Sequence, residues 1–247
     1  MFKGFKNKHF TEQKGLCVKM NERQEEILNL LKNKRRVSVA ELSKELFVCE
    51  MTIRRDLREM EQNKLLKRYH GGAMCLDQEN KFPISVRMFF GEEEKKELCR
   101  RAEKYLHDDM YIYIDTSSTC MHMIPLVKNY KNVKVITNSV KTLLYAAEHH
   151  IPCILTGGDY YETDMCVTGT ACERFIQDIN VDVAFLSPLA YSDDGLMTDW
   201  DEEQTHIRRI IMANAKQTVF LFASSKLHKK YVYTLCSKND ATEVITM

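Results

Sequence analysis

The N-terminal part of the chain places apolar residues at helical spacing among polar ones. From Asn21 onward, Ile27, Leu28 and Leu31 fall on one face of a helix, and acidic residues occupy its first turns, where the helix dipole stabilises negative charge. The residues before this point are polar, lysine-rich and aperiodic. They fit a flexible lead-in better than a packed element, so residues 1–20 are assigned no fold.

A capping-box pattern marks the start of a second, short helix. In the sequence Ser38-Val39-Ala40-Glu41, the serine hydroxyl and the glutamate three residues later satisfy backbone donors that a helix start leaves without partners. Val39, Leu42 and Leu46 recur at the spacing of one helical face. They form the predicted buried side of this helix.

A third helix is predicted from about Glu50 to Gln62, after the apolar pair Phe47-Val48. Ile53, Leu57 and Met60 are spaced along it so that all three face inward. Three short helices joined by tight connections predict a helix-turn-helix.

A two-stranded ribbon is predicted directly after the third helix. Its strands would run over residues 64–69 and 73–75, around a glycine turn at Gly71-Gly72. A ribbon in this position is the wing of a winged helix. Residues 21–76 are therefore expected to form a winged helix-turn-helix domain.

The remainder of the chain alternates short apolar runs with helical segments. Residues 77–90, which include Pro83, are expected to be a linker, and residues 91–247 are expected to form one domain. Near-continuously apolar strands separated by helices predict a Rossmann-like α/β domain, with a mostly parallel sheet covered on both faces. Ligands of such sheets bind beyond the carboxyl ends of the strands. The apolar runs are Tyr111–Ile114, Val133–Ile136, Cys153–Leu155, Val183–Leu186 and Val219–Phe222.

Charge divides the chain at the same place. Through Cys75 the sequence carries 17 lysines and arginines against 10 aspartates and glutamates, whereas the remainder carries 19 against 25. The formal net charge of +1 therefore conceals a basic head and an acidic body. A cluster of cations gains by displacing the counterions condensed on DNA, while an acidic body is repelled by the same duplex. The distribution favours a polyphosphate partner for the head.

The nine cysteines favour a reducing compartment. Their number is odd, they include no Cys-x-x-Cys pair, and no histidines cluster at metal-ligand spacing, so neither a disulfide framework nor a metal site is predicted. The first twenty residues hold five lysines and no sustained apolar core, and a run of about 18 apolar residues occurs nowhere. We therefore expect a cytoplasmic protein with no signal peptide, membrane span or cofactor.

The third predicted helix has a basic outer face. Stepping about 100° per residue from the buried Ile53 places four side chains on the opposite side: Met51, Arg54, Arg55 and Arg58. A major groove admits one helix, and guanidinium groups bind guanine edges or phosphates, so this face suits DNA recognition. Thr52, on the flank, suits a phosphate or a thymine methyl. The alternative is a solvated face whose arginines pair with Asp56, Glu59 and Glu61, and helical spacing alone leaves both interpretations open.

Three segments closely resemble the DNA-binding module of the DeoR family of bacterial transcriptional regulators. They are Arg36 to Leu42, Glu50 to Leu57 and His70 to Ala73. The resemblance implies that Thr52 and the following arginines contact the operator, and that the wing runs close to the DNA backbone. The predicted DNA-binding residues are Ser38, Met51, Thr52, Arg54, Arg55, Arg58, Lys67, Arg68, His70, Gly71 and Gly72.

One residue departs from the DeoR pattern at the start of the third helix. Cys49 stands where the family commonly has a serine that caps the recognition helix. A thiol caps poorly, so the substitution is expected to cost about 1 kcal/mol of helix stability without preventing folding.

The second half resembles the C-terminal domain of the same family, which is similar to ribose-5-phosphate isomerase and glucosamine-phosphate deaminase. Polar loops follow successive strands at Asp115–Thr119, Thr137–Ser139, Thr156–Asp159 and Val167–Gly169. Backbone N–H groups and hydroxyls at a helix start can surround a phosphate. The resemblance implies that these loops converge on a phosphorylated sugar. The predicted effector-binding residues are Asp115, Ser117, Ser118, Thr119, Thr137, Asn138, Ser139, Gly157, Gly158, Gly169, Glu203, Arg208 and Lys226.

Taken singly, these effector residues have ordinary structural explanations. Gly157-Gly158 alone is more often a turn, a Thr-Asn-Ser triplet more often caps a strand end, and a lysine such as Lys226 more often lies on a solvated surface. Their succession after consecutive strands favours the binding interpretation.

Departures from the family pattern bear on the identity of the ligand. Ser187-Pro188-Leu189-Ala190 replaces the Gly-Ala-Asp-Gly of many members, which removes an acid and stiffens the loop. Ser224 replaces a usual aspartate, Arg208 replaces a usual lysine, and Thr116-Ser117 stands where glycine is common. These changes predict a bulkier, less acidic pocket that accepts a different metabolite or none.

The favoured hypothesis is a transcriptional repressor, relieved by a phosphorylated sugar and acting on double-stranded operator DNA. Repeated half-sites in an operator require matching copies of the head, so a homo-oligomer is expected. One alternative is a sugar-phosphate isomerase or deaminase fused to a DNA-binding head. The loop at Ser187 lacks a carboxylate at a place where a general base would be convenient, although Asp115, Asp159 and Glu203 remain available. Another is a C-terminal domain that only oligomerises. We expect no catalytic residues.

Overall fold

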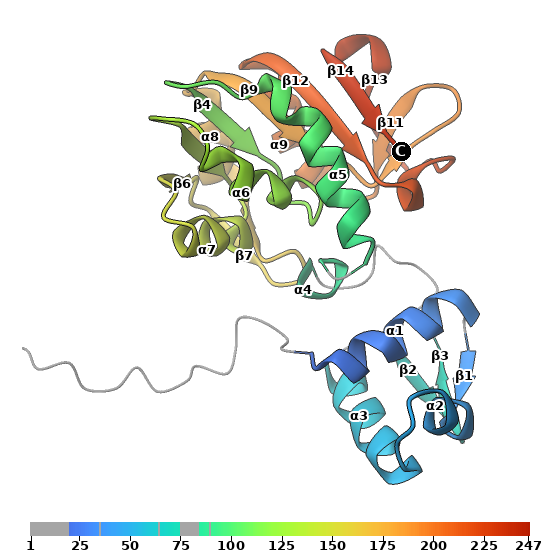
Figure 1. Cartoon of the computed structure of the whole chain (residues 1–247). Coiled ribbons are helices and arrows are strands. Elements are labelled where there is room, and N and C mark those ends of the chain that lie inside the picture. Colours follow the sequence, from blue (N-terminus) through green and yellow to red (C-terminus); the bar gives the residue numbers. More distant parts are fainter. Residues whose placement is uncertain (1–19, 35, 64, 75–83, 89) are drawn as a thin grey trace, which may run out of the picture. The chain divides into compact units, whose positions relative to one another are not determined.

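The computed structural model describes residues 20–34, 36–63, 65–74, 84–88 and 90–247. The chain divides into two compact units, Met1–Asp77 and Gln78–Met247, which are described separately below. The expected lead-in, apart from Met20, and most of the expected linker lie outside the described residues. The labels used for helices and strands are those of Figure 1.

The first unit contains the three predicted helices and the predicted ribbon. A further strand, β1, was not predicted and pairs antiparallel with β3, so that the sheet order is β1-β3-β2. The apolar face of each helix is buried as expected, except that Leu46 is half-buried because it is the C-cap residue of α2. The elements are α1 (Glu22–Lys34), β1 (Arg36–Ser38), α2 (Val39–Glu45), α3 (Glu50–Gln62), β2 (Lys67–Tyr69) and β3 (Gly72–Met74).

Local interactions fix where these elements begin and turn. Ser38 caps α2 with the predicted capping box, because Glu41 N donates to the serine hydroxyl while the Glu41 carboxylate accepts from Ser38 N. In the wing, Gly71 has a φ of +89°, a left-handed conformation that favours glycine. A Cβ on Gly72 would lie 2.3 Å from the carbonyl oxygen of Val37, so β1 and β3 approach too closely for any side chain there.

The second unit is built on a six-stranded parallel sheet of order β14-β12-β9-β4-β5-β6. Five of its strands coincide with the predicted apolar runs, and the edge strand β14 was not predicted. All six strands have their carboxyl ends at the same edge, as a parallel sheet requires. The strands are β4 (Tyr111–Ile114), β5 (Lys134–Thr137), β6 (Cys153–Leu155), β9 (Val181–Leu186), β12 (Ala215–Phe222) and β14 (Glu243–Thr246).

Helices cover both faces of this sheet, as the sequence predicts (Figure 1). One apolar cluster joins α5 (Glu92–Ala102), α6 (Ile124–Val127) and α7 (Val140–Glu148) to one face. The other joins α8 (Gly169–Gln177) and α9 (Glu202–Ala213) to the opposite face. Neighbouring residues of a strand therefore belong to different cores: Ile112 packs in the first cluster and Tyr113 in the second.

Smaller elements lie around the main sheet. A short helix, α4 (Ile84–Arg87), lies within the expected linker and packs on the second unit, where Ile84 is fully buried and its N–H donates to the carbonyl of Thr163. A three-stranded antiparallel sheet has the order β10-β11-β13, and β7 pairs with β8. These elements are β7 (Asp159–Tyr161), β8 (Cys166–Thr168), β10 (Ala190–Tyr191), β11 (Leu196–Asp199), β13 (Tyr233–Ser237) and the 3-10 turns η2 (Glu103–Tyr105), η3 (Cys120–Met123), η4 (Ser224–Lys226) and η5 (Lys238–Asp240).

Candidate functional sites

The outer face of α3 presents three exposed arginines, two of which have no partner among the described residues. Met51, Arg54, Arg55 and Arg58 are exposed, while Ile53 on the opposite face is fully buried. Arg54 forms a surface ion pair with Glu50 one turn earlier, an interaction worth little in water. Neither Arg55 nor Arg58 makes a hydrogen bond or an ion pair with any described residue.

Three acidic residues of α3, the ones expected to pair with its arginines, bind side chains of other elements instead. Asp56 is buried and binds the guanidinium of Arg23 on α1. Glu59 accepts from Gln24 on α1, and Glu61 pairs with Arg68 in the wing. None of the three pairs with an arginine of the outer face, so the pairing that the alternative interpretation expects does not occur among the described residues.

The N-terminus of α3 lacks a side-chain cap. Cys49 is the N-cap residue and makes no cap hydrogen bond, as expected from the departure at this position. Its sulfur instead lies 3.3 Å from the Thr52 hydroxyl, and this hydrogen bond lowers the pKa of the Cys49 thiol. Thr52 itself is half-buried on the flank of the helix.

The predicted wing residues divide into exposed and structural ones. Lys67, His70 and Gly71 are exposed, and Arg68 is half-buried beside Glu61. Gly72 is buried against β1, and the Ser38 side chain is held by its capping box. The structure gives Gly72 a packing role and Ser38 a helix-capping role.

In the second unit, a buried charge network ties the end of β4 to α9. Arg208 donates from Nε to Asp115 at 3.0 Å and from Nη1 to Asp199 at 2.6 Å, and all three side chains are at most 5% exposed. Burial lowers the pKa of Arg208, but the two carboxylates raise it by more, so the pKa is held above its usual value. Asp115 also accepts from Ser187 N at 3.0 Å, which fixes the loop after β9.

Lys226 lies in the same region and is fully engaged. Its ammonium donates to the Ser187 carbonyl at 2.8 Å and to the Ser187 hydroxyl at 2.7 Å. Burial, together with the positive charge of Arg87, lowers the pKa of Lys226 to about 8. The serine that stands in place of the family's glycine is therefore the partner of this lysine.

The loop after β4 forms a cradle of buried hydroxyls. Ser117 Oγ accepts from the backbone N–H of Cys120, and Ser118 Oγ accepts from the buried ammonium of Lys95 on α5 at 3.0 Å. Thr119 Oγ1 is buried without a hydrogen-bond partner among the described residues. An unsatisfied buried hydroxyl is a feature that a ligand can complete.

Hydrogen bonds to neighbouring elements hold the end of β5 and the loop that follows it. The Asn138 side chain accepts from Tyr113 and Thr116 and donates to the Val167 carbonyl, so it ties the loop after β5 to β4, to the loop after β4 and to β8. Thr137 donates to the Ile114 carbonyl, and Ser139 caps α7. These three predicted residues thus have structural roles at the sheet edge.

Three predicted glycines shape the loops, and one predicted residue lies outside. Gly158 has a φ of +126°, and a Cβ there would lie 2.3 Å from the Thr168 carbonyl oxygen, so only glycine fits. Gly157 and Gly169 also have positive φ values. Glu203 is exposed on α9 and makes no hydrogen bond or ion pair with the residues that the structure describes, so the fold does not bring it to the buried network.

A small cavity opens on this network and reveals residues that sequence reasoning missed. Its volume, measured as the space that the centre of a water molecule can reach, is only about 10 Å³, which is enough for about one water molecule. Its wall is more acidic than the Ser187 loop indicates, since Asp164, Asp199 and Asp201 supply carboxylates from other parts of the unit. The lining residues are Arg87, Thr116, Asp164, Ser187, Leu189, Asp199, Trp200, Asp201, Gln204 and Arg208.

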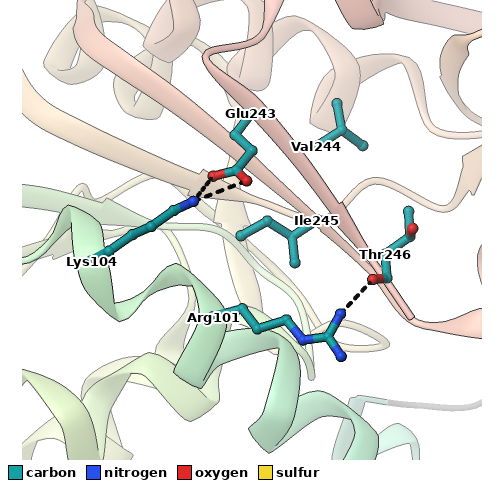
Figure 2. A pocket seen from close by; sticks show the side chains of 6 residues that line it. All are labelled: Arg101, Lys104, Glu243, Val244, Ile245 and Thr246. Atoms are coloured by element: carbon teal, nitrogen blue, oxygen red, sulfur yellow. Dashed lines mark hydrogen bonds and ion pairs between the residues drawn. The ribbon is translucent and has the colours of Figure 1, made fainter.

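Another hollow, of about 430 Å³, lies between α5 and β14 (Figure 2). Lys104 pairs with Glu243 and Arg101 donates to the Thr246 carbonyl at 3.1 Å, so its cations are already matched. No predicted effector residue lines it. Among the described residues, no group of three metal-binding side chains was found, and no helix in that part of the chain is long and apolar enough to cross a membrane.

Comparison with known proteins agrees with both halves of this description. Residues 23–79 match the DeoR-like helix-turn-helix domain, and residues 91–247 match the DeoR C-terminal sensor domain. The fold of the second unit is similar to a D-ribose-5-phosphate isomerase solved with phospho-erythronic acid, at a TM-score of 0.42 and 22% identity over 55% of this chain and 54% of that one.

Similar curated proteins are named as transcriptional regulators. The HTH-type regulator YulB of Bacillus subtilis is 31% identical over 91% of this chain and 88% of its own length. GolR of Listeria innocua is 29% identical over 83% and 82% of the two chains. The glycerol-3-phosphate regulon repressor of Escherichia coli is 26% identical over 93% and 91%. With both of its domains matched, the chain belongs to the DeoR family of transcriptional regulators.

Proposed function

We propose that this chain is a repressor that places α3 in the major groove of operator DNA. The observation that carries the proposal is the pair Arg55 and Arg58, exposed on the outer face of α3 and without partners among the described residues. Unpaired guanidinium groups on a helix gain more from guanine edges or phosphates than paired ones, because no existing ion pair has to be broken. Thr52, Arg54 and the exposed wing residues would add contacts on either side.

The operator can be obtained by selecting duplexes from a random library on the full-length chain. We expect Arg55→Ala and Arg58→Ala each to weaken binding of the selected duplex about tenfold or more, since a bidentate base contact contributes about 1–3 kcal/mol. Lys34→Ala is the matched control, because Lys34 is an exposed cation of the same unit that pairs with Glu45 on α2. Equal affinity of wild type and both arginine variants at moderate salt would refute the assignment.

A homo-oligomer acting in the cytoplasm completes this proposal. Operators read by helix-turn-helix proteins carry repeated half-sites one helical turn or its multiples apart, and each half-site needs one copy of α3. The second unit is the part of the chain available to hold the copies together. Sedimentation of the full-length chain tests this, and a monomer at the concentrations that saturate the selected duplex would contradict it.

We further propose that a phosphorylated sugar or polyol binds the second unit and lowers DNA affinity. The cradle of Ser117, Ser118 and Thr119 with the buried Lys95 offers hydroxyls and a cation to a phosphate. A relative is named as the repressor of a glycerol-3-phosphate regulon, which fits an effector of this class.

The test is titration of the complex with the selected duplex by glycerol 3-phosphate, ribose 5-phosphate and glucosamine 6-phosphate. Release of DNA by one of them supports the proposal. If none releases DNA or raises the melting temperature of the chain, the second unit serves only to oligomerise, because a ligand specific to the folded state must stabilise it.

A further inference from the structure

The cavity wall contains one guanidinium group that is held loosely. Arg208 binds two carboxylates, those of Asp115 and Asp199, whereas Arg87 binds a single carboxylate, that of Asp164, through Nη2. Arg87 Nε is buried and has no hydrogen-bond partner among the described residues. An anion that enters the cavity can therefore bind Arg87 without breaking the ion pairs of Arg208.

A buried acceptor lies in the same wall. Gln204 is 3% exposed, its Nε2 donates to Cys166 Sγ, and its Oε1 finds no partner in the part of the chain that the structure describes. It lies one helical turn before Arg208 on α9, so both face the cavity. An unsatisfied donor and an unsatisfied acceptor in one wall match a ligand that carries both an anionic group and a hydroxyl.

Arg87 also belongs to the segment that leads toward the DNA-binding unit. It is the last residue of α4, which begins ten residues after the end of β3. The helix is attached by the Ile84 N–H to the Thr163 carbonyl, by the Arg87 side chain to Asp164, and by the Arg87 carbonyl, which accepts from Lys95. Lys95 in turn donates to Ser118 of the phosphate cradle. The Arg87 side chain therefore connects α4 to the cavity, and the Arg87 carbonyl connects it through Lys95 to the cradle.

We propose that Arg87 is an effector-binding residue, and that the anionic group of a polyol phosphate replaces Asp164 as its partner and thereby shifts α4. This inference rests on the effector function proposed above and adds to it the residue that senses the anion. The present cavity holds about one water, whereas ligand sites enclose about 300–1,000 Å³, so binding requires a wall to move. The Arg87–Asp164 contact joins two short segments of that wall, α4 and the turn before β8. Breaking this contact would allow the two segments to separate and the cavity to widen.

The first experiment compares ligand affinities of full-length variants. Binding of glycerol 3-phosphate, ribose 5-phosphate and glucosamine 6-phosphate is followed by the fluorescence of Trp200, the only tryptophan, which lines the cavity. For a compound that binds wild type, we expect Arg87→Gln to weaken binding at least about tenfold, the loss of one charge-assisted interaction. Asp164→Asn removes the competing carboxylate and is expected to tighten binding by about the same factor.

Arg101→Gln is the matched control, since Arg101 is an arginine of the same unit that donates to a backbone carbonyl outside the cavity (Figure 2). Its ligand affinity should equal that of wild type. The gain expected for Asp164→Asn cannot arise from misfolding, so the proposal remains testable if Arg87→Gln is unstable. If wild type binds a compound and Arg87→Gln binds it equally well, this inference falls while the effector function stands. If wild type binds none of them, both fall.

The second experiment tests the coupling to α4. The Met88 N–H donates to the Ile84 carbonyl at 3.2 Å, so hydrogen exchange at Met88 reports on the integrity of the helix. We expect the bound compound to speed this exchange several-fold in wild type and to leave it unchanged in Arg87→Gln at saturating ligand. Unchanged exchange in ligand-saturated wild type would overturn the proposed movement of α4.

Discussion

Arg208, the buried arginine of α9, provides the sharpest test of what stabilises the second unit. Arg208 bridges Asp115 at the end of β4 and Asp199 at the end of β11, and the three side chains are at most 5% exposed. Arg208→Met leaves two carboxylates buried without their counter-ion. Removing one partner of a buried ion pair costs about 3–5 kcal/mol, and a domain has only about 5–15 kcal/mol in total.

Arg208→Lys separates geometry from charge. The guanidinium reaches Asp115 with Nε and Asp199 with Nη1, whereas a single ammonium cannot occupy both positions. Lysine therefore keeps the charge but loses about one of the two interactions, and hydrogen bonds to charged groups contribute about 1.5–3 kcal/mol. We expect the free energy of unfolding of Arg208→Lys to lie between that of wild type and that of Arg208→Met.

Trp200 makes the measurement specific, because the only tryptophan of the chain follows Asp199 directly and its backbone N–H donates to the Asp199 carboxylate. Urea unfolding followed by its fluorescence reports on the second unit alone. Arg100→Met is the control, since Arg100 is exposed and its surface pair with Glu97 is worth at most about 1 kcal/mol. A loss below about 1 kcal/mol for Arg208→Met would refute the view that this network stabilises the unit.

Three further predictions concern individual side chains. Phe47 is 93% exposed with a φ of +53°, so Phe47→Gly should slow hydrogen exchange in α2 and α3 by stabilising the first unit by about 1 kcal/mol; faster exchange would contradict this. Cys49→Ser supplies the missing cap of α3 and should stabilise the same unit by about 0.5–1 kcal/mol by that assay, with Cys153→Ser as the control. Burial, aided by the charge of Lys95, lowers the pKa of His122 to about 4. Between about pH 6.5 and 4, the His122 imidazole therefore binds a proton in the unfolded chain but not in the folded one, so the free energy of unfolding decreases as the pH falls through that window. Urea titrations at several pH values should show a smaller decrease for His122→Gln than for wild type.

The sequence predicts α3 and the five apolar strands because each is defined by its own periodicity. Ile53, Leu57 and Met60 mark one helical face whatever the rest of the chain does, and that face is buried as expected. By contrast, β1 has three residues and exists because it pairs with β3, which follows it by more than thirty residues. Short elements of this kind, α4 included, carry too few apolar positions to show a period.

The polar groups of the sensor site were harder to predict for a related reason. Asp115 and Arg208 follow from resemblance, but Asp199, the second carboxylate that Arg208 binds, ends a strand of a small antiparallel sheet that no apolar run predicts. Asp164 and Gln204 likewise reach the cavity through tertiary packing. Residue type and spacing do not encode which charges meet across loops that lie dozens of residues apart.

The acidity of the cavity wall sets a condition on any anionic effector. Ser187 removes the acid that many family members have in its loop, yet Asp164, Asp199 and Asp201 line the same cavity. An anion that entered while every carboxylate kept its place would meet more negative than positive charge, since the wall contains two arginines against three aspartates. It must therefore displace a carboxylate from a cation. Asp199 is 2% exposed, while the Asp164 side chain is 21% exposed, so Asp164 is the carboxylate that regains water most easily. Binding of an anion and release of Asp164 from Arg87 are thus one event.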